Sequence, residues 1–279
     1  MLPAVLNKYS KVPALYAVND TPILPTRIYL APPGKHLHVD RDRVRLSMGP
    51  RENRHRPSAD VLFRSAALAY GPRVIGIVLT GNLDDGAAGL VTIKDRGGLA
   101  MVQDPEDALA PSMPRSALEL AEPDYVLPVE EIGPKLAALV MTDEAAPKSR
   151  QPKLVGIKRT NASFPCPECG GVLNDFQEGE TTRFRCRVGH TYSPQSLFED
   201  QSLALERALW AAIRSLEEHA EFASRLASKS VSNDRPRASK RFEERARASR
   251  EHASILRELL DHGEDAGQPT PQEEATGTE

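Results

Sequence analysis

The fold is decided by residues 74–89, VIGIVLTGNLDDGAAG. Residues 74–79 are apolar and rich in β-branched side chains, which is typical of a strand buried on both faces of a parallel sheet. The glycine-containing turn that follows predicts a change from strand to helix, with the helix over 85–96 and a stop at Gly97-Gly98. Functional side chains gather where such strands end, so Asp85 is a candidate site residue.

Other interpretations of residues 80–89 stay open. Asp85 suits the N-cap of the following helix, because a carboxylate accepts free backbone N–H groups there. A phosphate-binding loop is disfavoured, because Gly-Lys-Ser/Thr is missing and two adjacent carboxylates would repel phosphate.

The flanking sequence alternates between strand and helix patterns. Apolar runs predict short strands at 27–31, 44–48, 99–102 and 125–127, and apolar spacings of three and four predict helices at 58–70, 113–120 and 129–140. Strands that alternate with helices indicate an α/β domain with a parallel sheet.

Composition excludes several classes of protein. The 279 residues carry 36 Lys and Arg against 39 Asp and Glu, a net charge of −3, which gives no electrostatic case for nucleic acid binding. No apolar run reaches membrane-spanning length and the first residues do not form a secretory signal, so we expect no membrane insertion. Three cysteines, all between 166 and 186, favour a reducing cytoplasm over a disulfide framework.

The cysteines form a metal-ligand pattern with a histidine. Cys166-x2-Cys169, sixteen residues and Cys186-x3-His190 predict a closed, structural zinc site with four protein ligands. Four protein ligands disfavour a catalytic metal, because they leave no open coordination position. Reduced, buried cysteines and a redox Cys-x-x-Cys pair are the other interpretations, and the second needs a βαβ context.

The chain is expected to divide into five parts. An α/β domain occupies 1–141, a polar linker 142–162, a zinc-ribbon module 163–193, an antiparallel helical hairpin 194–262 and a disordered acidic tail 263–279. The hairpin either packs only on itself or also docks to another helical protein or to a second copy.

Four ordered motifs resemble the catalytic domain of the chemotaxis protein-glutamate methylesterases, the CheB family. They are residues 28–36 (IYLAPPGKH), 53–63 (NRHRPSADVLF), 78–89 and 113–115 (MPR). The resemblance implies a doubly wound parallel sheet and hydrolysis of glutamate γ-methyl esters, with deamidation of glutamine, on methyl-accepting chemotaxis receptors. It also implies a Ser-His-Asp triad in which Asp85 is the aspartate.

The resemblance gives no position for the other two triad members. In the family, the serine turn and the histidine precede the segment matched by residues 1–3, and residues 1–141 contain no Gly-x-Ser-x-Gly turn. We therefore expect a partial, N-terminally truncated domain with impaired activity, through a truncated gene or a misassigned start. Ser58 is expected to begin a helix. His36 and His38 are expected to flank a turn in solvent.

Two functional hypotheses follow. The first is a protein-glutamate methylesterase with chemotaxis receptors as substrate, whose hairpin contacts other chemotaxis signalling proteins. The alternative is a non-catalytic adaptor built from the zinc ribbon and the helical hairpin.

Overall fold

The computed structural model describes residues 2–141, 160–178, 181–233 and 235–263. The chain divides into two compact units, residues 1–200 and 201–279. Within the described ranges, no helix has the length and apolar character needed to cross a membrane.

A three-stranded parallel sheet forms the centre of the first unit. Its order is β6 (Ile75–Val78), β7 (Leu99–Gln103) and β8 (Tyr125–Leu127), with Ile77 opposite Met101 and Met101 opposite Tyr125. Helix α3 (Ala87–Asp95) joins β6 to β7, and α4 (Ser112–Ala121) joins β7 to β8. The predicted α/β architecture with a parallel sheet is confirmed.

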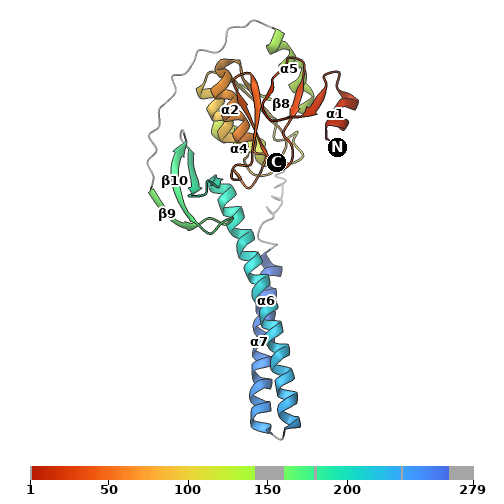
Figure 1. Cartoon of the computed structure of the whole chain (residues 1–279), viewed down its shortest axis with the longest axis vertical. Helices are drawn as coiled ribbons and strands as arrows, with labels where there is room; N and C mark the ends of the chain where they lie inside the picture. Colours follow the sequence, from red (N-terminus) through yellow and green to blue (C-terminus); the bar gives the residue numbers. More distant parts are fainter. Residues whose placement is uncertain (1, 142–159, 179–180, 234, 264–279) are drawn as a thin grey trace, which may run out of the picture. The chain divides into compact units, whose positions relative to one another are not determined.

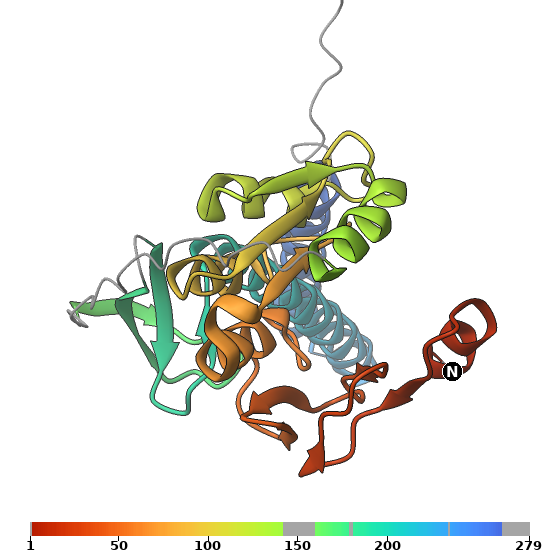
Figure 2. The same cartoon turned by 90° about the horizontal axis from the view of Figure 1, so that it is seen from above.

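Helices cover both faces of this sheet. Helix α2 (Ala59–Tyr70), followed by the 3₁₀ turn Gly71–Arg73, lies on one side of the strands and α5 (Val129–Met141) on the other (Figures 1 and 2). Alternate residues of β6 and β7, such as Val78 and Val102, point to the side of α2, α3 and α4. The buried core there consists of Ala67, Val78, Ala87, Leu90, Ile93, Ala100, Val102, Ala117 and Ala121.

The first fifty residues contain the two predicted strands, β3 (Ile28–Leu30) and β5 (Arg43–Ser47), and elements that the sequence patterns did not predict. The additional elements are α1 (Leu2–Tyr9), β1 (Ala14–Tyr16), β2 (Thr21–Pro22) and β4 (His36–Asp40). Strand β1 pairs in parallel with β3, and an antiparallel sheet has the order β2, β5, β4.

The solvated turn expected at His36 and His38 is wrong. Both residues belong to β4, and His36 pairs with Ser47 of β5. The turn lies just before them, where Gly34 adopts a φ of 75°. His36 is 2% exposed, and its Nε2 lies 2.9 Å from the carbonyl oxygen of Pro50.

The Cys/His module, residues 160–178 and 181–193, is an antiparallel sheet within the first unit. Its order is β12 (Thr191–Tyr192), β11 (Thr181–Cys186), β10 (Val172–Glu178) and β9 (Thr160–Pro165). Strand β9 begins inside the segment expected as a linker, of which residues 142–159 lie outside the described part. The buried core consists of Cys166, Leu173, Cys186, Tyr192 and Leu197.

Two long helices follow, α6 (Pro194–Ser232) and α7 (Pro236–Gly263), and they run side by side (Figure 1). Their contacts have the antiparallel order, because Glu217 pairs with Arg257 while Ser224 accepts from Arg250. Among the described residues from 201 onward, the buried apolar side chains of the two helices are small apart from Ile213, and the others are Ala220, Ala223, Ala227, Ala246 and Ala253. The acidic tail predicted from residue 263 onward lies almost entirely outside the described residues.

Candidate functional site

Asp85 lies in the turn between β6 and α3, at the carboxyl edge of the parallel sheet, and is 9% exposed. Its Oδ1 accepts hydrogen bonds from Ser58 Oγ (2.6 Å), Asp60 N (3.2 Å) and Asn53 Nδ2 (3.4 Å), and its Oδ2 accepts one from Ala59 N (2.7 Å). The backbone donors belong to the first turn of α2, where free N–H groups attract a carboxylate.

Asp85 therefore caps a different helix from the one that the local sequence indicates. The N-cap of α3 is Gly86, with a φ of 98° and no side-chain hydrogen bond. Ser58 begins α2 as expected, but its hydroxyl makes no cap hydrogen bond and donates to Asp85 instead. The carboxylate thus joins the turn after β6 to the N-terminus of α2.

A second carboxylate, Asp60, lies beside Asp85 and is completely buried. Its Oδ1 accepts from the backbone N–H groups of Gly86 (3.0 Å) and Gly89 (2.7 Å), at the start of α3. Its Oδ2 accepts from Asn53 Nδ2 (2.8 Å) and from Arg183 Nη1 (2.9 Å). Asp60 consequently holds the start of α3 on one side and a buried cation on the other.

Arg183 comes from β11 of the Cys/His module and is 1% exposed. Its Nη2 donates to Asn53 Oδ1 at 3.2 Å, and Glu52 and Glu178 lie 3.7 and 3.9 Å from the guanidinium. Arg64 of α2 pairs with the same two glutamates, at 2.5 and 3.7 Å. Arg183 of the module thus forms a buried salt bridge with Asp60 of the α/β part.

The electrostatic environments of the three aspartates differ. Burial acts to raise the pKa of Asp60, but the nearby Arg183 and Arg64 outweigh it and the pKa of Asp60 falls below its ordinary value. For Asp85, burial and then the negative charge of Asp60 raise the pKa, against the hydrogen bonds from Ser58 and α2. Burial likewise raises the pKa of Asp84. Asp84 Oδ1 is buried without a hydrogen-bond partner among the described residues.

No histidine is among the hydrogen-bond donors that the described residues offer to Asp85. The structure does form serine–histidine hydrogen bonds elsewhere, between His38 Nε2 and Ser47 Oγ (2.8 Å) and between His219 Nδ1 and Ser249 Oγ (2.9 Å). The second pair joins α6 to α7, and the first joins adjacent strands. Asp85 is a partner in neither.

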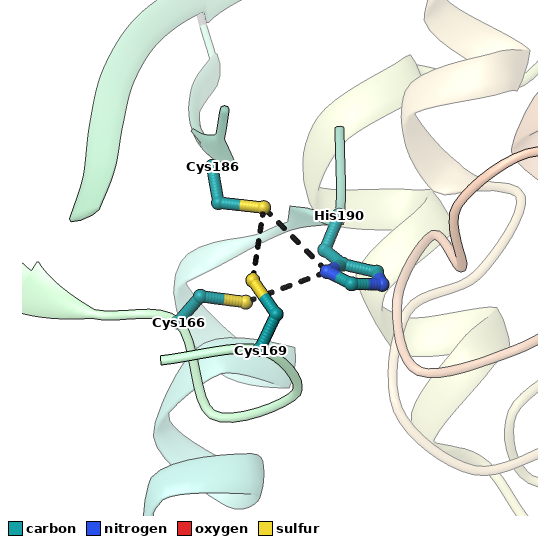
Figure 3. A group of neighbouring side chains, drawn as sticks. All are labelled: Cys166, Cys169, Cys186 and His190. Atoms are coloured by element: carbon teal, nitrogen blue, oxygen red, sulfur yellow. Dashed lines mark hydrogen bonds between the residues drawn. The ribbon is translucent and has the colours of Figure 1, made fainter. Parts of the chain in front are cut away.

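The four predicted metal ligands come together in the Cys/His module (Figure 3). His190 Nδ1 lies 3.7 Å from Cys166 Sγ and 3.5 Å from Cys186 Sγ, while the Sγ atoms of Cys169 and Cys186 are 3.6 Å apart. Ligands of a tetrahedral zinc ion stand roughly 3.5–3.8 Å from one another. All four ligand atoms lie within 4.8 Å of one another, so this group could hold a metal ion.

Two tight turns present these ligands. The backbone N–H groups of Gly170 and Gly189 donate to the carbonyl oxygens of Cys166 and Cys186, at 2.7 and 3.0 Å. Both glycines have positive φ values, 70° and 110°, which side-chain-bearing residues rarely adopt. Burial opposes ionisation of Cys186, but the N–H of Gly189 and the thiol of Cys169 outweigh it and lower the pKa of Cys186.

The fold and the site define an α/β domain of the open parallel-sheet class, with buried carboxylates at the carboxyl edge of the strands. A family model described as CheB methylesterase matches residues 1–136. A protein of Leptospira interrogans classed among the protein-glutamate methylesterases/protein-glutamine glutaminases is 44% identical over 129 residues, which are 46% of this chain and 67% of the relative. The chain therefore belongs to the CheB methylesterase family.

Two further proteins are similar to part of this chain. Protein-glutamate methylesterase/protein-glutamine glutaminase 1 of Xanthomonas campestris is 41% identical over 138 residues, 48% of this chain and 38% of the relative. The crystal structure of the Thermotoga maritima CheB methylesterase catalytic domain shares 31% identity with a TM-score of 0.48, over 50% of this chain and 75% of that chain. The chain thus spans about two thirds of the Leptospira protein and little more than a third of the Xanthomonas protein.

Proposed function

We propose that this chain acts as a protein-glutamate methylesterase of chemotaxis signalling, which hydrolyses glutamate γ-methyl esters and deamidates glutamines on methyl-accepting chemoreceptors. The observation that carries the proposal is the buried Asp85 at the carboxyl edge of the sheet, within a chain that is 44% identical over 129 residues to a Leptospira protein named for this activity. The sheet is then part of the doubly wound sheet that the family resemblance implies.

In this proposal Asp85 is the aspartate of a Ser-His-Asp triad. Such an aspartate orients the histidine and stabilises its protonated form while the histidine takes the proton of the serine. Asp85 is suited to this work because four hydrogen bonds fix its orientation. We further propose that the chain by itself has impaired activity, because the described residues bring no histidine into contact with Asp85.

The test compares methanol release from a methylated chemoreceptor fragment by two proteins. One is this chain, and the other is this chain fused to the part of the Leptospira protein outside the aligned region. We expect low turnover by the chain and clear turnover by the fusion, with a loss of about 10⁴-fold on Asp85→Asn, as for other triads. A folded fusion with equal turnover before and after this substitution would show that Asp85 is not the triad member.

We also propose that Cys166, Cys169, Cys186 and His190 bind a structural zinc ion. The support is the ligand spacing and a module core too small to fold without a metal. Purified chain should contain about one zinc per molecule by elemental analysis. Cys169→Ser should lower that content, and His252→Ala, an exposed position on α7, serves as the control. Zinc content unchanged by Cys169→Ser would contradict the site.

The helical pair is proposed to contact other chemotaxis signalling proteins in the cytoplasm. In support, Leu205, Trp210 and Leu259 are exposed by 62%, 48% and 61% and line one hollow between α6 and α7. Crosslinking from position 210 in cells should capture a chemotaxis protein and should give none from position 229 of the same helix. A non-catalytic adaptor is favoured instead if capture succeeds while the fusion protein is folded and inactive.

A further inference from the structure

The Cys/His module supplies the cation that pairs with the buried carboxylates around Asp85. We propose that Arg183 is a positioning residue of the Asp85 site, so that metal binding by the module controls the order of that site. This inference rests on the proposed function for the role of Asp85, but the contacts that carry it concern the described residues alone.

Asp60 connects Arg183 to Asp85 by three sets of hydrogen bonds. Its backbone N–H donates to Asp85 Oδ1 at 3.2 Å. Its Oδ1 accepts from the N–H groups of Gly86 and Gly89, so it fixes the backbone directly after Asp85. Its Oδ2 accepts from Arg183 Nη1 at 2.9 Å. A displacement of Asp60 would therefore disturb both the backbone next to Asp85 and one of its donors.

Arg183 is the cation on which Asp60 depends. The Asp60 side chain is 0% exposed and that of Arg183 is 1% exposed, so neither charge is solvated by bulk water. A buried carboxylate without a paired cation is strongly destabilising. The other nearby cation, Arg64, donates its Nη2 to Glu52 and lies closest to glutamates. Loss of Arg183 would leave Asp60 buried without the one cation that contacts its carboxylate among the described residues.

Asn53 ties a second part of the module to the same group. Its Oδ1 accepts from Arg183 Nη2 (3.2 Å) and from the backbone N–H of Ser193 (3.3 Å), the residue that follows β12. Its Nδ2 donates to Asp60 Oδ2 and to Asp85 Oδ1. One amide side chain thus contacts two segments of the module on one side and both carboxylates on the other.

The predicted metal ligands hold the strand that carries Arg183. Cys186 ends β11, three residues after Arg183, and His190 directly precedes β12. A sheet with so small a core depends on its metal to keep these strands together. Metal release would therefore free Arg183 and Ser193, and the order around Asp60 and Asp85 would fall with them.

The first experiment is hydrogen–deuterium exchange of the full chain with and without a zinc chelator. We expect the amides of Ala59, Asp60, Gly86 and Gly89 to exchange at least about tenfold faster after metal removal and in Arg183→Met, while α5 keeps its protection. Arg187→Met, an exposed arginine of the same module, is the control and should leave these amides unchanged.

Two further variants separate positioning from a general loss of stability. In Arg183→Met/Asp60→Asn, both charges are removed while the introduced amide keeps an oxygen for Gly86 and Gly89, so protection should largely return. Arg183→Lys, which keeps the positive charge, should retain part of the protection from exchange. Unchanged exchange at Ala59 and Gly86 in folded Arg183→Met, or an equal rise in every helix including α5, would overturn the proposal.

The pH profile of methanol release by the fusion protein gives the functional readout. Arg183→Met should shift the pH profile, because it removes the positive charge beside Asp60 and Asp85. Arg183→Lys keeps a positive charge there and should restore the profile in part. An unchanged profile in an active Arg183→Met fusion would overturn the positioning role. An inactive fusion would count against the proposed function alone, because the exchange measurements do not depend on turnover.

Discussion

The hydroxyl of Ser58 donates a 2.6 Å hydrogen bond to Oδ1 of Asp85, across 27 residues of sequence. This bond joins two of the four motifs on which the family resemblance was based, residues 53–63 and 78–89. Both residues are buried, at 3% and 9% exposure. The motifs therefore meet in space, where the second supplies the carboxylate and the first supplies the donors that orient it.

Removal of the Ser58 hydroxyl should weaken the contact between these two motifs. Ser58→Ala takes one charge-assisted hydrogen bond from a buried carboxylate, for which we expect a loss of about 1.5–3 kcal/mol in the free energy of unfolding. Urea denaturation of the full chain measures it. Ser116→Ala is the matched control, because its hydroxyl contacts are long, at 3.4 Å, and should cost much less. Equal losses for the two variants would show that the Asp85 contact adds no stability.

Close packing of α3 on α2 gives a second prediction. A Cβ atom at Gly89 would lie 2.6 Å from Phe63 Cβ and 3.1 Å from Asp60 Cα, so Gly89→Ala must push the two helices apart. We expect it to lower the free energy of unfolding by about 1–3 kcal/mol, as overpacking does. Gly133→Ala in α5 has no atom within 4 Å and should change little. A Gly89→Ala protein as stable as the control would contradict the close approach.

The sequence predicted the central fold because its signals are local. The apolar run of β6 and the helical stripe of α2 each reveal burial within one element, and both elements are confirmed to within a residue or two. Strands β1, β2 and β4, which have three, two and five residues, were not predicted from the sequence. What makes them strands is their pairing with other segments, as between His36 and Ser47.

Only part of the candidate site was predicted, because only part of it produces a local signal in the sequence. Asp85 was found because it follows a buried strand, and its catalytic role stays a prediction. Arg183 was missed because its partner Asp60 is 123 residues away, and no local pattern reveals such a pair. The sequence did contain a signal for Asp60. This residue lies seven positions, or about two helical turns, before Ala67 and therefore falls on the buried face of α2. A carboxylate on a buried face requires a partner.

Asp84 gives a prediction on pH. Burial raises the pKa of Asp84 in the folded state, so its contribution to stability is fully present below the unfolded pKa of about 4 and is lost as pH rises through the folded pKa. Asp84→Asn does not titrate there. Its melting temperature, relative to the wild-type protein, should therefore increase across that window, with a gain of order 1–3 kcal/mol at neutral pH.

Asp107 is the control for this measurement, because its pKa is shifted in the opposite direction to that of Asp84. Hydrogen bonds from the backbone N–H of Val129 and from Gln103 lower the pKa of Asp107. Its stabilising contribution is present above the unfolded pKa and is lost as pH falls through the folded pKa. Asp107→Asn should therefore be less stable than the wild-type protein at neutral pH, by an amount that shrinks in acid. Parallel pH profiles for the two variants would show that burial of Asp84 does not govern its titration.

The helical unit can be tested separately because the chain has a single tryptophan, Trp210 on α6. Its fluorescence reports the unfolding of residues 201–279. Ile213 is 2% exposed and is the largest of the buried apolar side chains among the described residues of this unit, of which the others are alanines, so Ile213→Ala should remove about 2–5 kcal/mol. Ile255→Ala, at a position 54% exposed on α7, should stay within about 0.5 kcal/mol of the wild-type value. If both variants lost the same stability, α6 and α7 would not pair through the buried Ile213.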